Sequence, residues 1–369
     1  MSLRIVVSGM LAAIPGQGGA SWAVLQYVLG LRRLGHDVVF VEPAAPSDAT
    51  QSYFEHVVAR FDLHDRAALL DPATGACGGV DRRRLLAFAA GADLLLNISG
   101  VLEDEELLAA IGVRAFVDLD PAFTQLWCAA DGIDMGFERH NRFVTIGGRI
   151  GSDGCAVPTC GRDWITTLQP IVLERWPVAD RVEHRALTTV GHWRAYGSIE
   201  HGGVHYGQKA HALRALLELP RRAEARFALA LGMHRDEWRD LAALDEHGWE
   251  LLDPAEVACT PDAYAAFVRG SWAEFGLAKS GYAASACGWF SDRSVCYLAS
   301  GRPVLALDTG FGADIPTGEG LLAFSTVEEA VAGVAELRDG YERHRRAARS
   351  LAEDLFDSDR VLRGLLACL

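Results

Sequence analysis

The sequence is short of positive charge, of paired cysteines and of long apolar runs. Its 35 lysine and arginine residues stand against 49 aspartate and glutamate residues, giving a formal net charge of −14. This balance argues against a nucleic-acid backbone or an anionic membrane surface as the main partner, although it leaves room for a local positive pocket. No apolar run approaches the length of a membrane span, and residues 1–14 are typical of a first strand rather than a signal peptide. We therefore expect a soluble cytoplasmic protein with no integral membrane segment.

The eight cysteines are scattered, which favours a reduced intracellular chain over a disulfide framework. Cys155 and Cys160 lie in the glycine-rich segment 147–161 without nearby partners, so they are a weak zinc signal and no metal site is expected. The chain has 369 residues, half of them apolar, and exceeds the size at which one core usually keeps growing. Two domains are therefore expected.

The first segments predict a strand, a glycine-rich loop, a helix and a second strand, over residues 3–8, 14–20, 21–34 and 38–41. The glycines let a ligand approach the backbone and leave the helix N-terminus open, which suits a phosphate or a sugar. Their spacing is Gly-x-Gly-Gly, and not the Gly-x-Gly-x-x-Gly of dinucleotide-binding units. Glu42 nevertheless follows the second strand, where such a unit places its ribose carboxylate, so a nicotinamide or flavin enzyme stays an alternative.

Two carboxylates, Asp118 and Asp120, end the strand expected over residues 114–119. The carboxyl ends of parallel strands face the crevice in which such sheets bind ligands. By the period of two the side chains point to the same side, and both are candidates for acid/base chemistry or for binding a hydroxyl group. The alternative is that Asp120 and Pro121 only open a turn.

The strand and helix pattern restarts after a polar stretch at residues 173–185. A new strand leads to Gly191 and His192, and a glycine-rich passage then carries Arg194 and Lys209. Arginine offers a planar fork of donors and lysine a mobile point charge, so the passage is suited to a diphosphate. His192, directly after the strand, is a candidate to face the cleft. Each of these residues alone is typical of a solvated surface.

Another candidate phosphate site lies within residues 289–312. Ser291 and Asp292 are good N-caps for a short apolar helix, Gly301 is placed to end it, and residues 303–307 are typical of a buried strand. A helix start beside an arginine presents free N–H groups and a positive dipole end to an anion. A purely structural capped helix is the alternative.

These segments together resemble the glycosyltransferases with two Rossmann-like domains, known as GT-B. The glycine-rich loop and the entry to the second strand resemble theirs, and so do an Ala-Ser-Gly-x-Pro-Val segment, a Gly-Leu-Leu strand and a final pair of helices. In this sequence they are residues 14–20, 34–39, 298–310, 318–324, 326–337 and 340–355.

The resemblance implies an α/β fold of two Rossmann-like domains facing across a cleft. It implies an N-terminal acceptor domain over residues 1–180, a nucleotide-sugar domain over 181–347, and a C-terminal helix over 348–369 that crosses back. Arg194 and Lys209 match the positions of the family's diphosphate-binding pair, and Gly18 and Gly19 would reach across the cleft. The full expected donor site is Gly18, Gly19, Gly191, His192, Arg194, Lys209, Ser291, Asp292, Arg293, Ser294, Asp308 and Thr309.

The chain departs from the family pattern at the catalytic positions. Retaining members carry two glutamates eight positions apart, and here those positions hold Gly288 and Cys296. Neither accepts hydrogen bonds as a carboxylate does, so ribose and sugar recognition would pass to Asp292 or Asp308. Inverting members often place a histidine base after the first strand, whereas residues 8–11 contain none. Asp120 is then the candidate catalytic base.

We therefore predict a glycosyltransferase of the hexosyltransferase class that moves a sugar from a nucleoside-diphosphate sugar to a small-molecule acceptor. The nucleotide sugar is a co-substrate, no further cofactor is expected, and a homodimer is compatible with the pattern. A nucleotide-sugar epimerase of the same fold and a non-catalytic binding protein stay open as alternatives. Epimerisation without an acceptor distinguishes the first, and absence of nucleotide binding favours the second.

Overall fold

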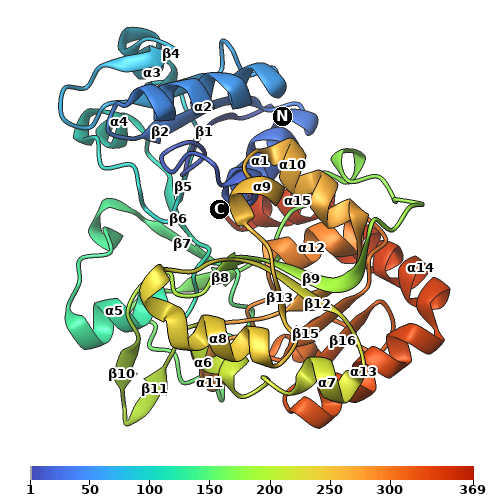
Figure 1. Cartoon of the computed structure of the whole chain (residues 1–369). Coiled ribbons are helices and arrows are strands. Elements are labelled where there is room, and N and C mark those ends of the chain that lie inside the picture. The colour runs from blue at the N-terminus through green and yellow to red at the C-terminus, as the bar shows by residue number, and fades with distance from the viewer. Residues whose placement is uncertain (1) are drawn as a thin grey trace.

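The computed structural model describes residues 2–369 as two sheets flanked by helices (Figure 1). The first sheet has the strand order β4-β3-β2-β1-β5-β6-β7-β8 and is parallel except for β4, which runs antiparallel to β3. The order reverses between β1 and β5, where open parallel sheets place their ligands. The strands are β1 (Arg4–Ser8), β2 (Asp37–Pro43), β3 (Ala67–Leu70), β4 (Cys77–Gly79), β5 (Leu94–Ile98), β6 (Arg114–Asp118), β7 (Arg142–Thr145) and β8 (Trp164–Thr166).

The helices of this first half begin where the sequence supplies caps. Ser47, Asp81 and Asp104 each accept a hydrogen bond from a backbone N–H of the first turn. The first helix is unusual because most of its residues are buried, since it packs on the sheet and also contacts two later helices. The helices are α1 (Gly18–Arg33), α2 (Asp48–Arg60), α3 (Arg82–Ala89), α4 (Glu105–Ala110) and α5 (Phe123–Asp131), with a 3-10 turn at Phe137–Arg139.

The second sheet is fully parallel, with the order β13-β12-β9-β14-β15-β16. Its strands are β9 (His184–His192), β12 (Phe227–Gly232), β13 (Glu250–Leu251), β14 (Ser271–Gly276), β15 (Val304–Leu307) and β16 (Leu321–Phe324). Its helices are α6 (Lys209–Arg214), α7 (Leu219–Ala223), α8 (Trp238–Glu246), α9 (Pro254–Val257), α10 (Pro261–Gly270), α11 (Ser280–Ser285), α12 (Asp292–Ala299) and α13 (Val327–Asp339). The mixed α/β architecture with two Rossmann-like sheets agrees with the expected fold class. The boundaries at residues 180 and 347 stay predictions.

A hairpin between β9 and α6 extends from the second half to the first. Its strands β10 (Ile199–His201) and β11 (Val204–Tyr206) are antiparallel and lie beside α5 (Figure 1). Gly202 and Gly203 turn the chain with φ of 59° and 77°, which only glycine adopts readily. A buried apolar cluster then joins the halves, formed by Ala122, Phe123, Leu126, Ile150 and Val157 on one side and Ile199, Tyr206, Ala278, Tyr282 and Cys287 on the other.

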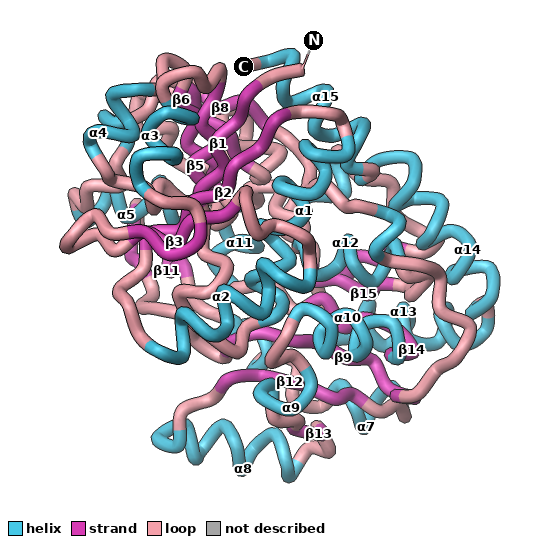
Figure 2. The backbone as a smooth tube through the Cα atoms, turned by 90° about the horizontal axis from the view of Figure 1, so that it is seen from above, coloured by secondary structure: helices cyan, strands magenta, loops and turns pink. Residues whose placement is uncertain are grey.

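The last helices return to the first half. After α14 (Tyr341–Leu351) and a π-helical turn at Ala352–Phe356, α15 (Ser358–Cys368) packs against α1. A Cβ on Gly30 would lie 2.6 Å from Leu362 Cδ1, so the small residue permits this close approach. Figure 2 shows α14 on the side of the second sheet and α15 on the side of the first. None of the helices within residues 2–369 is long and apolar enough to cross a bilayer.

Candidate functional site

A cavity of about 410 Å³ lies between the two halves. The loop between β1 and α1 lines it from the first half, and the end of β9, the start of α9, one residue of α10 and the start of α12 line it from the second. The lining residues are 15–17, 19, 20, 190–192, 253–255, 258, 264, 292 and 293. A larger open groove of about 630 Å³, between residues 316–319 and α14, contains none of the expected site residues.

Glu42 holds the loop that lines the cavity from the first half. Its buried carboxylate accepts hydrogen bonds from the N–H groups of Leu11, Ala12 and Ala13 at 2.7–2.9 Å. Burial raises the pKa of Glu42 to about 7, although the three N–H groups act in the opposite direction. With both oxygens used in this way, Glu42 anchors the loop and is not placed to bind a ribose.

Gly18 and Gly19 bring this loop against the second half. Gly18 N–H donates to the carbonyl of Ala258 at 2.8 Å, and a Cβ on Gly18 would lie 2.1 Å from the Thr260 carbonyl oxygen. A Cβ on Gly19 would lie 2.9 Å from the Tyr264 ring. Only glycine fits at either position without displacing its neighbours. Gly18 therefore makes the contact between the halves, and Gly19 lines the cavity beside it.

The start of α12 presents a buried cation to the cavity. Ser291 caps the helix by accepting a hydrogen bond from the N–H of Arg293. The Arg293 side chain donates from Nε to Glu274 at 2.6 Å and from Nη1 to the Val190 carbonyl at 3.1 Å, while its buried Nη2 has no partner within residues 2–369. Asp292 lines the cavity next to it. The structure thus places a guanidinium, a group suited to binding an anion, at the cavity wall.

Lys209 begins α6 behind the cavity wall. Its Nζ lies 3.4 Å from the place that a Cβ on Gly191 would take, and Gly191 lines the cavity. Burial lowers the pKa of Lys209 to about 7, and the cations Arg293 and Lys279 lower it further. Asp120 acts in the opposite direction without forming an ion pair with Lys209. The residue is half-buried, and an anionic ligand next to it would raise this pKa and favour the charged amine.

Arg194 is predicted from the sequence to bind a diphosphate together with Lys209, and in the structure its side chain forms an ion pair with another residue. Its Nε donates to Glu237 at 2.6 Å, and it is not among the residues that line the cavity. His192 does line the cavity, and burial lowers its pKa, with the nearby cations adding to the effect. Among the lining residues, Arg293 is the one with a permanent positive charge.

Three other expected site residues have local structural partners. Asp308 accepts a hydrogen bond from the Gly310 N–H at 2.8 Å, and the Thr309 hydroxyl donates to the Trp289 carbonyl, so both shape the turn after β15. Ser294 is buried in α12. None of the three lines the cavity. Of the two carboxylates predicted to bind the ribose, Asp292 lines the cavity and Asp308 does not.

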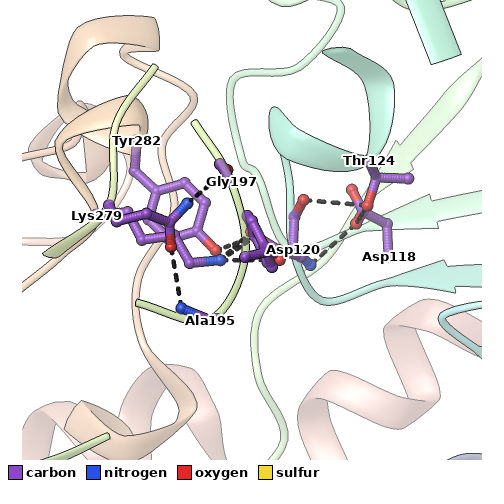
Figure 3. A network of polar contacts seen from close by, with 9 residues as sticks. Asp118, Asp120, Thr124, Ala195, Gly197, Lys279 and Tyr282 are labelled. Carbon is purple, nitrogen blue, oxygen red and sulfur yellow. Dashed lines mark hydrogen bonds and ion pairs between the residues drawn. The ribbon is translucent and has the colours of Figure 1, made fainter. Parts of the chain in front are cut away.

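Asp118 and Asp120 have different surroundings (Figure 3). Asp118 is buried in the first half and accepts hydrogen bonds from Thr124, Gln125 and Thr145 at 2.8, 2.8 and 2.9 Å. Burial raises the pKa of Asp118 to about 6, and these donors act against the rise. Its Oδ1 also accepts from the Asp120 N–H at 3.0 Å. Asp118 thus supports the loop that carries Asp120.

Asp120 lies where the halves meet. Lys279 Nζ is 2.9 Å from both of its carboxylate oxygens, and the hydroxyls of Tyr196 and Tyr282 donate to it. The lysine also lies over the rings of Phe123, Tyr196 and Tyr282, at 4.7, 4.0 and 5.1 Å from their centres. None of these three donors was expected from the sequence. Lys279 follows strand β14 closely. The rule that the carboxyl ends of parallel strands face the ligand, which singled out Asp120, therefore applies to Lys279 as well.

The two positions that lack glutamates are filled in different ways. A Cβ on Gly288 would lie 2.9 Å from Arg149 Cγ and 3.0 Å from Arg149 N, so the first half's loop occupies that space. Cys296 is buried in α12. Cys155 and Cys160 have separate neighbours, the carbonyls of Ser285 and Gln125. In the described part of the chain, no group of three potential ligands could hold a metal ion.

No family model matches the chain, and no curated protein matches it. Solved structures do. An α-glucosyltransferase in complex with UDP is 12% identical over 100% of this chain and 99% of its own, with a TM-score of 0.67. A structure of the α-glucosyltransferase with UDP and a 13-mer DNA has a TM-score of 0.65 at 13% identity, covering 100% and 99%. Anabaena HepE in complex with UDP and glucose is 10% identical over 100% of both chains, with a TM-score of 0.57. At such identities the likeness concerns the fold, and this chain has the GT-B fold of glycosyltransferases: two Rossmann-like domains facing across a cleft.

Proposed function

We propose that this protein is a glycosyltransferase that moves a sugar from a nucleoside-diphosphate sugar to a small-molecule acceptor. The observation that carries the proposal is the cavity between the halves. The glycine loop and the start of α12 with Arg293 line it, and Lys209 lies behind its wall next to Gly191. These groups suit a ligand that carries two phosphates.

In this proposal the diphosphate lies between Gly19, Gly191 and the start of α12. Its departure from the sugar builds negative charge, which fixed N–H dipoles and the cations Arg293 and Lys209 would stabilise without further reorganisation. The nucleoside would extend along residues 253–258, with Asp292 as the ribose acceptor. The sugar would then point past Lys209 towards Asp120, whose charge is felt at Lys209.

Asp120 is our candidate for the carboxylate that acts on the reacting sugar or the acceptor hydroxyl. It follows strand β6 in the first half and lies on the cleft, and its side chain keeps 30% of its surface exposed. A positioned carboxylate contributes about 10²–10⁴-fold to such proton transfers. Asp118, by contrast, is enclosed by its donors and has a supporting role.

Calorimetry with uridine nucleotides tests the binding step, because UDP is present in the solved structures named above. Incubation of the protein with a panel of nucleotide sugars and water alone tests the chemistry. Release of free sugar and nucleoside diphosphate supports a transferase. Epimerisation without an acceptor would replace it by an epimerase, and failure to bind any nucleotide would favour a non-catalytic protein.

The acceptor is proposed to be a small molecule, and not DNA, because of the net charge of −14. The proposed reaction takes the nucleotide sugar as co-substrate and includes no further cofactor or metal. A cytoplasmic location and a homodimer belong to the same proposal. Gel filtration with light scattering tests the dimer, and labelled DNA in the transfer assay tests the alternative acceptor.

A further inference from the structure

We propose that Lys279 is a positioning residue of the transfer reaction, which acts by fixing the carboxylate of Asp120 across the cleft. This inference rests on the proposed function, because it assigns Lys279 a role in the chemistry that Asp120 would perform. The evidence is the set of contacts around Asp120, to which the two halves of the molecule contribute different parts (Figure 3).

The second half supplies every side-chain donor to the Asp120 carboxylate. Oδ1 accepts from Lys279 Nζ and the Tyr282 hydroxyl, and Oδ2 accepts from Lys279 Nζ and the Tyr196 hydroxyl. Two donors on each oxygen fix the rotation of the carboxylate about its terminal bond. Charge-assisted hydrogen bonds of this kind are about twice as strong as neutral ones. Lys279 is the one donor that contacts both oxygens.

The first half fixes the backbone from the opposite side. Asp118, itself held by three donors, accepts the N–H of Asp120 at 3.0 Å. Two residues later Ala122 is fully buried with φ of 72°, a conformation that a residue with a Cβ rarely adopts. Such strain persists only where the surroundings impose it, and it is common beside functional sites. The backbone and the side chain of Asp120 are thus constrained independently.

The contacts also argue against a role for Lys279 in binding the diphosphate. Lys279 is 7% exposed, and its Nζ donates to Asp120 and Tyr196 while lying over three aromatic rings. Lys209, its neighbour, makes no ion pair within residues 2–369 and lies beside the cavity wall. The two lysines therefore have different roles: Lys279 holds the Asp120 carboxylate, and Lys209 is available to the ligand.

These different roles predict that replacing Lys279 changes kcat, whereas replacing Lys209 changes the Kd for the nucleoside diphosphate. Lys279→Met, which keeps the length and loses the charge, should lower kcat for donor hydrolysis by about 100-fold and leave the Kd for the nucleoside diphosphate within about threefold. Lys209→Met should raise that Kd by tenfold or more. Hydrolysis of the nucleotide sugar is the assay, so no acceptor needs to be known.

A double-mutant comparison with Asp120 distinguishes a positioning role of Lys279 from a general structural role. In the Asp120→Asn background, Lys279→Met should lower kcat by no more than about threefold, because the group that it positions is already lost. Tyr282→Phe, which removes one donor without changing charge, should lower kcat about tenfold with an unchanged Kd. It also serves as the probe if Lys279→Met fails to fold, as judged by thermal melting.

A raised Kd with unchanged kcat in Lys279→Met, or independent losses from Lys279→Met and Asp120→Asn, would overturn the inference and leave the proposed function in place. If the wild-type protein binds nucleotide but hydrolyses no nucleotide sugar, the proposed function itself is overturned. The two failures are thus distinguished by whether the wild-type protein or only the variants depart from expectation.

Discussion

Nucleotide-sugar binding should depend on pH through Lys209. Burial lowers its pKa to about 7, so above that pH the free protein carries a neutral amine at this position. Binding a diphosphate favours the charged form, and the amine must then take up a proton from solution. If the pKa in the complex returns to the ordinary value of about 10.4, uptake should be about 0.9 proton per ligand at pH 8 and about 0.1 at pH 6.

The affinity follows from the same linkage. Between pH 6 and pH 8 the Kd should rise about tenfold, which is about 1.4 kcal/mol. An intact nucleotide sugar is the suitable ligand, since its diphosphate does not titrate in this range. Calorimetry in buffers of different ionisation enthalpy measures the proton uptake directly. Burial lowers the pKa of His192, which also lines the cavity.

Lys209→Gln is the matched control, because it cannot gain a proton and should bind with a pH-independent Kd over the same range. Equal proton uptake by the wild-type protein and the variant would refute the assignment of the titrating group to Lys209. A wild-type Kd that stays constant from pH 6 to pH 8 would show that this amine is already charged in the free protein.

Three further variants test other parts of the structure. Arg194→Ala should change nucleotide affinity by less than about threefold in calorimetry, because Arg194 pairs with Glu237 away from the cavity, and a tenfold loss would contradict the geometry. Arg293→Met should destabilise the fold by about 3–5 kcal/mol in urea unfolding, because it leaves the buried Glu274 carboxylate without its partner; Glu274→Gln in the same chain should recover part of that loss. Gly30→Val should detach the last helix, since a Cβ there meets Leu362 at 2.6 Å, and limited proteolysis should then cut α15 before the rest of the chain.

The sequence predicts the first βαβ unit closely, because its signals are local. Strand and helix expected at residues 3–8 and 21–34 are observed at Arg4–Ser8 and Gly18–Arg33. Buried parallel strands are continuous apolar runs, and Gly35 ends the helix, so neither needs information from elsewhere in the chain. The carboxyl-end rule also singles out Asp120, which accepts hydrogen bonds from side chains of the other half; its role in the reaction stays a prediction.

Other elements depend on partners that are distant in sequence. Strand β14 (Ser271–Gly276) includes the buried Glu274, a polar residue whose partner Arg293 lies on a later helix. Gly202 and Gly203, interpreted as part of a phosphate loop, turn the β10–β11 hairpin instead. A phosphate loop and a hairpin turn both use the positive φ that glycine adopts readily, so the presence of glycines does not distinguish the two interpretations.

The expected pairing of Asp118 with Asp120 on one side shows the limit of a periodicity rule. Strand β6 ends at Asp118, and beyond that residue the alternation of side chains no longer applies. Asp118 therefore remains inside the first half while Asp120 faces the second. The donors to Asp120 could not be predicted from its own segment, because Tyr196, Lys279 and Tyr282 come from the other sheet's connections.

The return of α15 to α1 has a consequence for synthesis on the ribosome. The face of α1 around Gly30 is formed early but is covered only when Ser358–Cys368 have been translated. At about 5–20 residues per second, that interval is on the order of tens of seconds. During this time the nascent N-terminal half exposes an apolar helix face, which is a ready binding site for a chaperone. Folding of this half is therefore completed only after residues 358–368 have been translated, and not in the order in which its strands emerge.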